Sequence, residues 1–114
     1  MTPKQKLILF LIYSDPGVKS IYGLVKQFDR ADFPGKVGIE IKVLIEIGLI
    51  KVSTYFDNGT ESDYEVTEQG TKFIKENFNS DEILEYISHM PNPDFLYKLT
   101  QKYIEKGHNL QQGI

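Results

Sequence analysis

Residues 50–66 carry the pattern of a β-hairpin, and no other feature of the chain limits its fold more strongly. Ile50 to Phe56 alternates in polarity and is rich in β-branched and aromatic residues, as strands usually are. Asp57-Asn58-Gly59 is a strong hairpin turn, and Tyr64 to Val66 can return as the second strand. The sequence therefore predicts a two-stranded hairpin with a loop of about five to seven residues.

Three segments before this hairpin are candidates for helices. Lys4 to Ser14 is apolar nearly all round, which predicts a central helix closed by the turn Asp15-Pro16-Gly17. Ser20 is placed to act as the N-cap of a short amphipathic helix over residues 21–28. A third helix is expected to start close to Lys36, after a polar turn that contains proline and glycine.

The third segment, Val37 to Ile47, fits two patterns. Every odd position in it is apolar, which is also typical of a strand. The helical pattern also fits. At ~100° per residue, one stripe of the helix would contain Val37, Ile41, Leu44 and Gly48. We favour the helix, with Gly48 as its C-terminal cap.

Three further helices are expected after the hairpin. Thr67 can cap the fourth and Ser80 the fifth, whereas the sixth opens at Asp94 and ends at Gly107. The last seven residues, 108–114, should fray. This order of elements predicts an α+β fold of the winged helix-turn-helix type.

The predicted winged-helix domain covers residues 1–78, and residues 79–107 form a C-terminal helical extension. The end of the third helix and the start of the wing read Leu44-Ile45-Glu46-Ile47-Gly48-Leu49-Ile50. This run resembles bacterial MarR-type and PadR-type transcriptional regulators, in which a Leu is followed four residues later by Gly-Leu-Ile. The second wing strand, Tyr64-Glu65-Val66-Thr67-Glu68-Gln69-Gly70, is similar to their Tyr-x-Leu-Thr-x-x-Gly pattern.

The second helix carries a third motif of this kind. Ser20-Ile21-Tyr22-Gly23-Leu24 looks like the His-Gly-Tyr-Glu-Leu opening of that helix in PadR-type proteins, with Tyr and Gly exchanged in order. Together the three motifs span roughly residues 4–78. The resemblance implies that the third helix enters the major groove of double-stranded DNA, that the second helix touches phosphate, and that the wing lies along the backbone or minor groove.

The resemblance also implies a set of nucleic-acid-binding residues on these three elements. Lys36 and Lys42 could reach phosphates or guanine edges, and the apolar side chains of the third helix could meet thymine methyl groups. The full candidate set is Lys19, Ser20, Tyr22, Lys36, Ile39, Lys42, Val43 and Lys51.

Charge favours an alternative. The chain has 13 basic and 16 acidic residues, a net charge of -3, and residues 49–66 alone carry one base and four acids. A wing of that charge would be repelled by phosphate. The second hypothesis is a winged-helix protein-interaction module without DNA binding, in which Ile39 and Val43 form an apolar contact and the acidic wing meets a basic partner.

The extension after residue 78 needs cover for its apolar side chains, either from its own first helix or from a partner. In the families that the chain resembles, helices outside the wing commonly build a dimer, so we predict a homodimer through this segment. The predicted interface comprises Ile83, Leu84, Ile87, Phe95, Leu96, Leu99 and Tyr103.

Nothing in the sequence indicates catalysis, and we expect a non-enzyme without metal or cofactor. His89 and His108 have no ligand cluster at metal-binding spacing around them, and no carboxylate pair, phosphate loop or nucleophile elbow is visible. The absence of cysteine fits a cytoplasmic protein. The longest apolar run, Leu7 to Tyr13, is far shorter than the ~20 residues of a membrane span.

Overall fold

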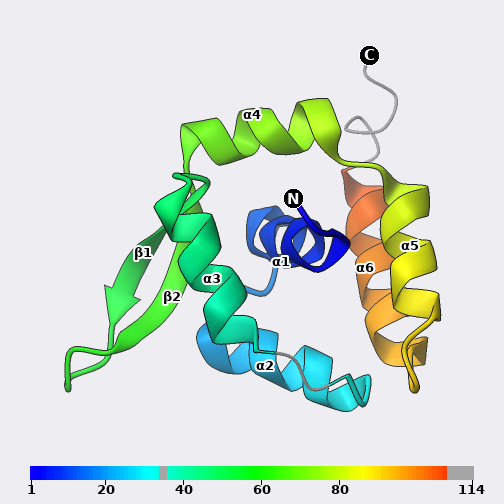
Figure 1. Ribbon diagram of the computed structural model, residues 1–114, viewed down its shortest axis with the longest axis horizontal. Coiled ribbons are helices and arrows are strands. Elements are labelled where there is room, and N and C mark those ends of the chain that lie inside the picture. Colours follow the sequence, from blue (N-terminus) through cyan, green and yellow to red (C-terminus); the bar gives the residue numbers. More distant parts are fainter. Residues whose placement is uncertain (34–35, 108–114) are drawn as a thin grey trace.

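The computed structural model describes residues 1–33 and 36–107 (Figure 1). Within these residues, six helices and a two-stranded antiparallel sheet form an α+β fold. The elements are α1 (Pro3–Tyr13), α2 (Ile21–Arg30), α3 (Val37–Glu46), β1 (Ile50–Tyr55), β2 (Glu61–Val66), α4 (Glu68–Asn77), α5 (Ser80–Ser88) and α6 (Asp94–Lys106). This order, with a hairpin directly after the third helix, is compatible with a winged helix-like arrangement.

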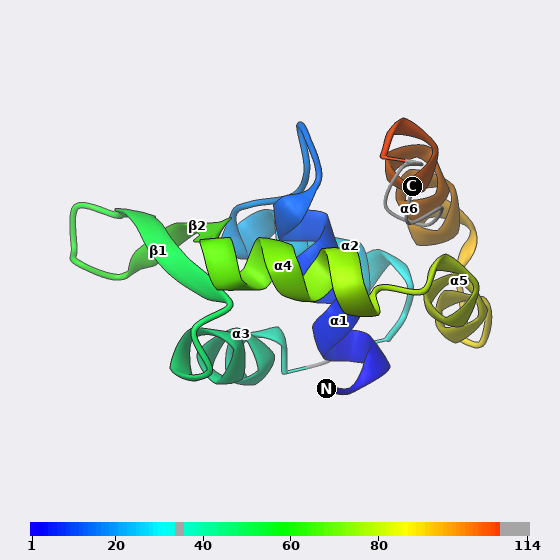
Figure 2. The same cartoon turned by 90° about the horizontal axis from the view of Figure 1, so that it is seen from above.

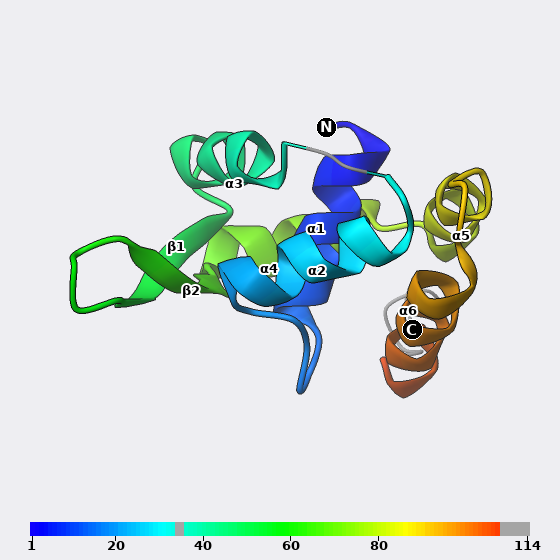
Figure 3. The ribbon, with the colours of Figure 1, turned by 90° about the horizontal axis from the view of Figure 1, so that it is seen from below.

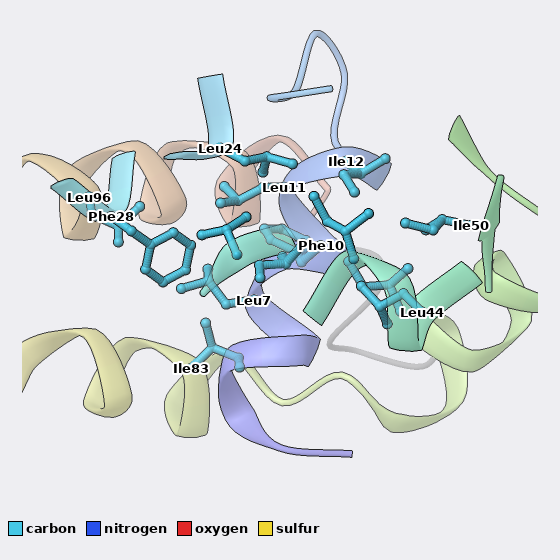
Figure 4. Close-up of a cluster of buried hydrophobic side chains, with 14 of the residues drawn as sticks. Leu7, Phe10, Leu11, Ile12, Leu24, Phe28, Leu44, Ile50, Ile83 and Leu96 are labelled. Carbon is cyan, nitrogen blue, oxygen red and sulfur yellow. The ribbon is translucent and has the colours of Figure 1, made fainter. Parts of the chain in front are cut away.

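Helix α1 is the centre of the molecule. Figure 1 shows it nearly end-on, with the other helices placed around it. All six residues of 7–12 are buried, which explains why this segment is apolar on every side. Figure 4 shows Leu7, Phe10 and Ile12 among side chains from the surrounding elements, and the Phe10 ring stacks on Phe78 with centroids 4.3 Å apart.

The ambiguous third segment is a helix. Val37, Ile41 and Leu44 are buried, so the core takes the helical stripe and not the alternating set. Gly48 follows the end of α3 with a positive φ of 82°, a conformation that glycine adopts without strain. The chain can therefore turn at once into β1, where Ile50 is buried.

The hairpin projects from the helical body at the end opposite to α5 and α6 (Figures 2 and 3). Its register pairs Ile50 with Val66 and Val52 with Tyr64. Strand β2 begins at Glu61, earlier than the predicted Tyr64, because pairing with β1 extends toward the turn.

The sequence did not predict a third contact of this sheet. Asp63 forms an isolated antiparallel bridge with Ser20, and the Tyr64 N–H donates to the Lys19 carbonyl at 2.8 Å. The residues just before α2 are thereby fastened to the outer edge of β2. The hairpin is thus continuous with α3 and α4 along the chain, packs on α1, and is also held by the start of α2.

Side-chain hydrogen bonds test three of the predicted helix caps. Ser20 Oγ accepts from the Gly23 N–H at 2.9 Å, and Thr67 Oγ1 accepts from the Gly70 N–H at 3.0 Å, so both of these caps are confirmed. The cap of α5 is Asn79, whose Oδ1 accepts from Glu82 N–H at 3.0 Å. The prediction of Ser80 was wrong by one position, since asparagine caps helices as well as serine does.

The C-terminal extension packs on its own chain, with α5 against α1 and α6 against α2. Four of the seven predicted interface residues belong to the hydrophobic core of the single chain: Ile83, Ile87, Leu96 and Tyr103. Their side chains are not available to a partner, which corrects the predicted dimer surface. Leu84 and Leu99 are half-buried, and only Phe95 is exposed, at 51%.

Three contacts fix the extension to the end of α2. The Asn92 N–H donates to the Ala31 carbonyl at 3.1 Å, and Asn92 Nδ2 donates to the Arg30 carbonyl at the same distance. The Arg30 guanidinium lies 4.4 Å from the centroid of the Phe95 ring, a cation–π contact. The predicted fraying of residues 108–114 lies outside the described residues.

Candidate nucleic-acid interface

An open groove of about 710 Å³ separates α3 from the hairpin. Its first wall comes from the start and outer face of α3 and is lined by Lys36, Gly38, Ile39 and Lys42. Its second wall comes from the hairpin and is lined by Tyr55, Gly59, Thr60, Glu61 and Tyr64. We call this feature the α3–wing groove, and its two sides the α3 wall and the wing wall.

The α3 wall is basic and unobstructed. Lys36 and Lys42 are exposed, and neither forms an ion pair with any other described residue. Ile39 is 53% exposed between them, and a Cβ placed on Gly38 would meet no atom within 4 Å. Because the opposite face of α3 is held in the core, this face stays free for a ligand.

The wing wall combines aromatic and acidic groups. The buried Tyr64 donates its hydroxyl hydrogen to Glu61 Oε1 at 3.0 Å, which holds that carboxylate at the groove. Burial raises the pKa of Tyr64 above its ordinary value, and the hydrogen bond to Glu61 and the negative charges of Glu61 and Asp63 raise it further. Tyr64 is therefore a neutral hydrogen-bond donor, and Tyr55 beside it is 63% exposed.

Lys19 and Ser20 do not reach this groove. Lys19 Nζ donates to the carbonyls of Ile12 and Ser14, at 2.5 and 3.0 Å, so its ammonium group is turned toward the end of α1. The Ser20 hydroxyl oxygen is the N-cap acceptor of α2. Both side chains have structural partners in the places where phosphate contacts were expected.

Three other predicted residues also lie apart from the groove lining. Tyr22 is 73% exposed, and its ring meets Phe56 with centroids 5.7 Å apart. Val43 is half-buried. Lys51 pairs with Glu65 across the two strands at 3.2 Å, so its charge is neutralised within the wing. Of the eight predicted residues, the groove thus brings together Lys36, Ile39 and Lys42.

Sequence reasoning missed the exposed aromatic residues of the wing. Tyr55 and Phe56 are adjacent at the end of a strand, where neighbouring side chains face opposite sides, so at least one had to lie outside the core. Eight large apolar side chains are exposed among the described residues, and six of them lie on α2, on α3 and the α3–β1 link, and on the hairpin. These six are Tyr22, Val25, Ile39, Ile47, Tyr55 and Phe56.

Metal and membrane features were sought in the same part of the chain. Among residues 1–33 and 36–107, no group of three or more His, Cys, Asp or Glu side chains could hold a metal ion. His89 is exposed and its Nδ1 lies 3.1 Å from the Glu85 carbonyl oxygen, while His108 is outside the described residues. No described helix has the length and apolar character that crossing a membrane requires.

Comparison with protein families, curated proteins and solved structures finds no match to this chain. The likeness to MarR-type and PadR-type regulators therefore stays a prediction from three sequence motifs. A functional conclusion has to come from the chemistry of the α3–wing groove and from the order of the elements that form it.

Proposed function

We propose that this chain is a winged helix-turn-helix DNA-binding protein that acts as a transcriptional regulator of the MarR/PadR type. One observation carries the proposal: the outer face of α3 is free, and it presents Lys36, Ile39 and Lys42 along one wall of an open groove. The major groove of B-DNA admits an α-helix with this kind of polar and apolar outer face.

In the proposed complex, α3 lies in the major groove and one DNA strand passes through the α3–wing groove. The ammonium groups of Lys36 and Lys42 contact phosphates or guanine edges, and Ile39 meets a thymine methyl group. Gly38 leaves room for close approach of the DNA backbone, because nothing lies within 4 Å of where its Cβ would stand. Double-stranded DNA is the partner, and no cofactor, metal or catalytic step is part of this function.

Charge on the wing limits the affinity of such a complex. Lys51 is paired with Glu65, and the remaining acids of the wing oppose the phosphate backbone. Two lysines per chain then carry the electrostatic attraction. Since each phosphate contact contributes about -0.9 to the salt slope, log K should fall against log salt with a slope near -2 per bound chain.

A second candidate function rests on a separate observation. Six exposed apolar side chains lie on α2, on α3 and the link after it, and on the hairpin, and residues 49–66 carry one base against four acids. A protein-interaction module that binds a basic partner would use these features and would not need DNA. In either role the proposed location is the cytoplasm.

Fluorescence anisotropy with a labelled mixed-sequence duplex tests the DNA-binding proposal. We expect binding at ~50 mM salt that weakens with a slope near -2 as salt rises. Lys36→Glu/Lys42→Glu should abolish binding, whereas the matched control Lys75→Glu/Lys102→Glu, which changes the same charge on exposed positions of α4 and α6, should bind as the wild type does. Absence of wild-type binding at high micromolar protein would overturn the proposal.

A further inference from the structure

The two walls of the α3–wing groove carry opposite charge. Lys36 and Lys42 are on the α3 wall, whereas Glu61 lies on the wing wall and Asp57 is exposed in the hairpin turn just beyond it. The ion pairs among the described residues join Lys6 to Glu82 and Lys51 to Glu65, so neither lysine of the α3 wall is neutralised by the wing of its own chain. The groove therefore offers a basic and an acidic surface side by side.

Exposed apolar area accompanies these charges. Ile39 and Tyr55, on opposite walls of the groove, are 53% and 63% exposed, whereas Phe56 contacts Tyr22 of α2 outside the groove lining. Outside α2, α3, the hairpin and the short α3–β1 link, the exposed large apolar side chains of the described part are Met1 and Phe95. An apolar cluster rimmed by charge is typical of a protein-interaction surface.

The geometry points to a second copy of this chain as the occupant: we propose that two copies associate about a two-fold axis that passes between the two walls. A two-fold interface uses the same patch on both subunits. An axis in this position places the basic α3 wall of each copy opposite the acidic wing wall of the other, so both walls find a complementary charge. Ile39 of each copy then lies against Tyr55 of the other.

Charge complementarity selects a second copy over other protein partners. A uniformly acidic partner would be opposed by Glu61, and a uniformly basic partner would be opposed by Lys36 and Lys42, because like charges placed together across an interface are unfavourable. A second copy carries both signs in the required arrangement. The hairpin also projects from the helical body, as Figures 2 and 3 show, which allows it to reach across a neighbouring α3.

This self-association goes beyond the proposed DNA binding and does not depend on it. The dimer covers Lys36, Ile39 and Lys42, so DNA and the second copy compete for one surface. It also replaces the tail dimer expected from the sequence, because Ile83 and Ile87 are fully buried within the single chain.

Sedimentation equilibrium of the full chain tests the proposal. The wild type should shift with concentration from the chain mass of 13.1 kDa toward twice that value. Lys36→Glu/Lys42→Glu and Asp57→Lys/Glu61→Lys should each raise the dimer dissociation constant by about tenfold or more, since each places like charges across the interface. Lys75→Glu/Lys102→Glu is the control and should leave this constant unchanged.

A mixture of the two charge-reversed proteins gives the sharpest result. In their heterodimer each reversed wall faces a wall of opposite charge, so the mixture should regain the wild-type dissociation constant although neither variant alone dimerises well. Asp57→Lys, in the exposed turn, replaces the double wing variant if circular dichroism shows that the latter is unfolded. The proposal is wrong if the wild type stays at 13.1 kDa at hundreds of micromolar, or if the mixture does not recover. Loss of DNA binding in a protein that still dimerises would refute only the regulator function.

Discussion

The ammonium group of Lys19 lies against the C-terminal end of α1, where Nζ donates a hydrogen bond to the Ser14 carbonyl at 3.0 Å. A second bond goes to the carbonyl of Ile12. The last carbonyls of a helix lack partners within the helix and carry partial negative charge, so a cation is favourable there. Lys19 thus joins the end of α1 to the segment that pairs with β2.

Replacement of Lys19 by methionine keeps the apolar stem and removes these two bonds. We expect Lys19→Met to lower the free energy of unfolding by about 1–2 kcal/mol. Lys26→Met, at an exposed position of α2, should change it by less than about 0.5 kcal/mol. Urea titration measures both. If Lys19→Met kept the full stability of the wild type but bound DNA more weakly, Lys19 would be a DNA contact and not a structural residue.

Truncation of Ile87 tests whether the C-terminal extension belongs to the single-chain core. This side chain is 0% exposed, so Ile87→Ala should reduce the free energy of unfolding by about 2–5 kcal/mol. The half-buried Leu84 serves as the comparison, and Leu84→Ala should cost distinctly less. The measurement is urea unfolding at a concentration where the chain is monomeric. A small stability change with loss of the dimer would support the tail interface instead.

Replacement by alanine should have opposite effects on stability at Gly70 and at Gly38. A Cβ on Gly70 would lie 2.0 Å from the Leu49 carbonyl oxygen and 2.6 Å from Val66 Cγ1. Gly70→Ala should therefore destabilise the fold by at least about 3 kcal/mol. Gly38→Ala meets no atom within 4 Å and should stabilise α3 by about 0.5–1 kcal/mol. Thermal unfolding of the two variants measures both changes in stability. Equal changes for Gly70→Ala and Gly38→Ala would contradict the described packing at the base of the hairpin.

Tyr64 makes the stability of the hairpin sensitive to alkaline pH. Its pKa is raised in the folded chain, mainly by burial, above the value of about 10 expected for the unfolded chain. The stabilising contribution of the neutral phenol is complete below pH ~10 and is lost as pH rises through the folded pKa. Wild type should lose more unfolding free energy than Tyr64→Phe between pH ~9 and ~12. Parallel curves for the two proteins would refute this.

Local patterns accounted for much of the fold. Gly48 takes the left-handed conformation after α3, Thr67 caps α4, and Ile50 begins the first strand of the hairpin, as the sequence predicted. Each of these features depends on residues within a few positions of one another. The pairing of Lys51 with Glu65 was also within reach, because these residues stand opposite in the register of the two strands.

Contacts between distant segments could not be predicted from such patterns. The four-residue spacing of Ile83 and Ile87 predicts that one face of α5 is buried. This spacing does not say whether α1 or a partner chain packs on that face. Lys19 follows a turn whose path decides whether its ammonium group meets a phosphate or a carbonyl. The approach of Lys42 and Glu61 to one groove likewise depends on how the hairpin sits beside α3.

The direct test of DNA recognition by α3 compares two charge-reversed variants, one on each wall of the groove. The measurement is the affinity of each variant for the same DNA duplex. At ~50 mM salt, Lys36→Glu/Lys42→Glu should bind at least about tenfold more weakly than wild type, because it loses both phosphate contacts. Asp57→Lys/Glu61→Lys should bind more tightly, since the wing no longer repels the backbone and no longer supports the competing dimer. Equal affinities for wild type and both variants would contradict DNA binding through the α3–wing groove.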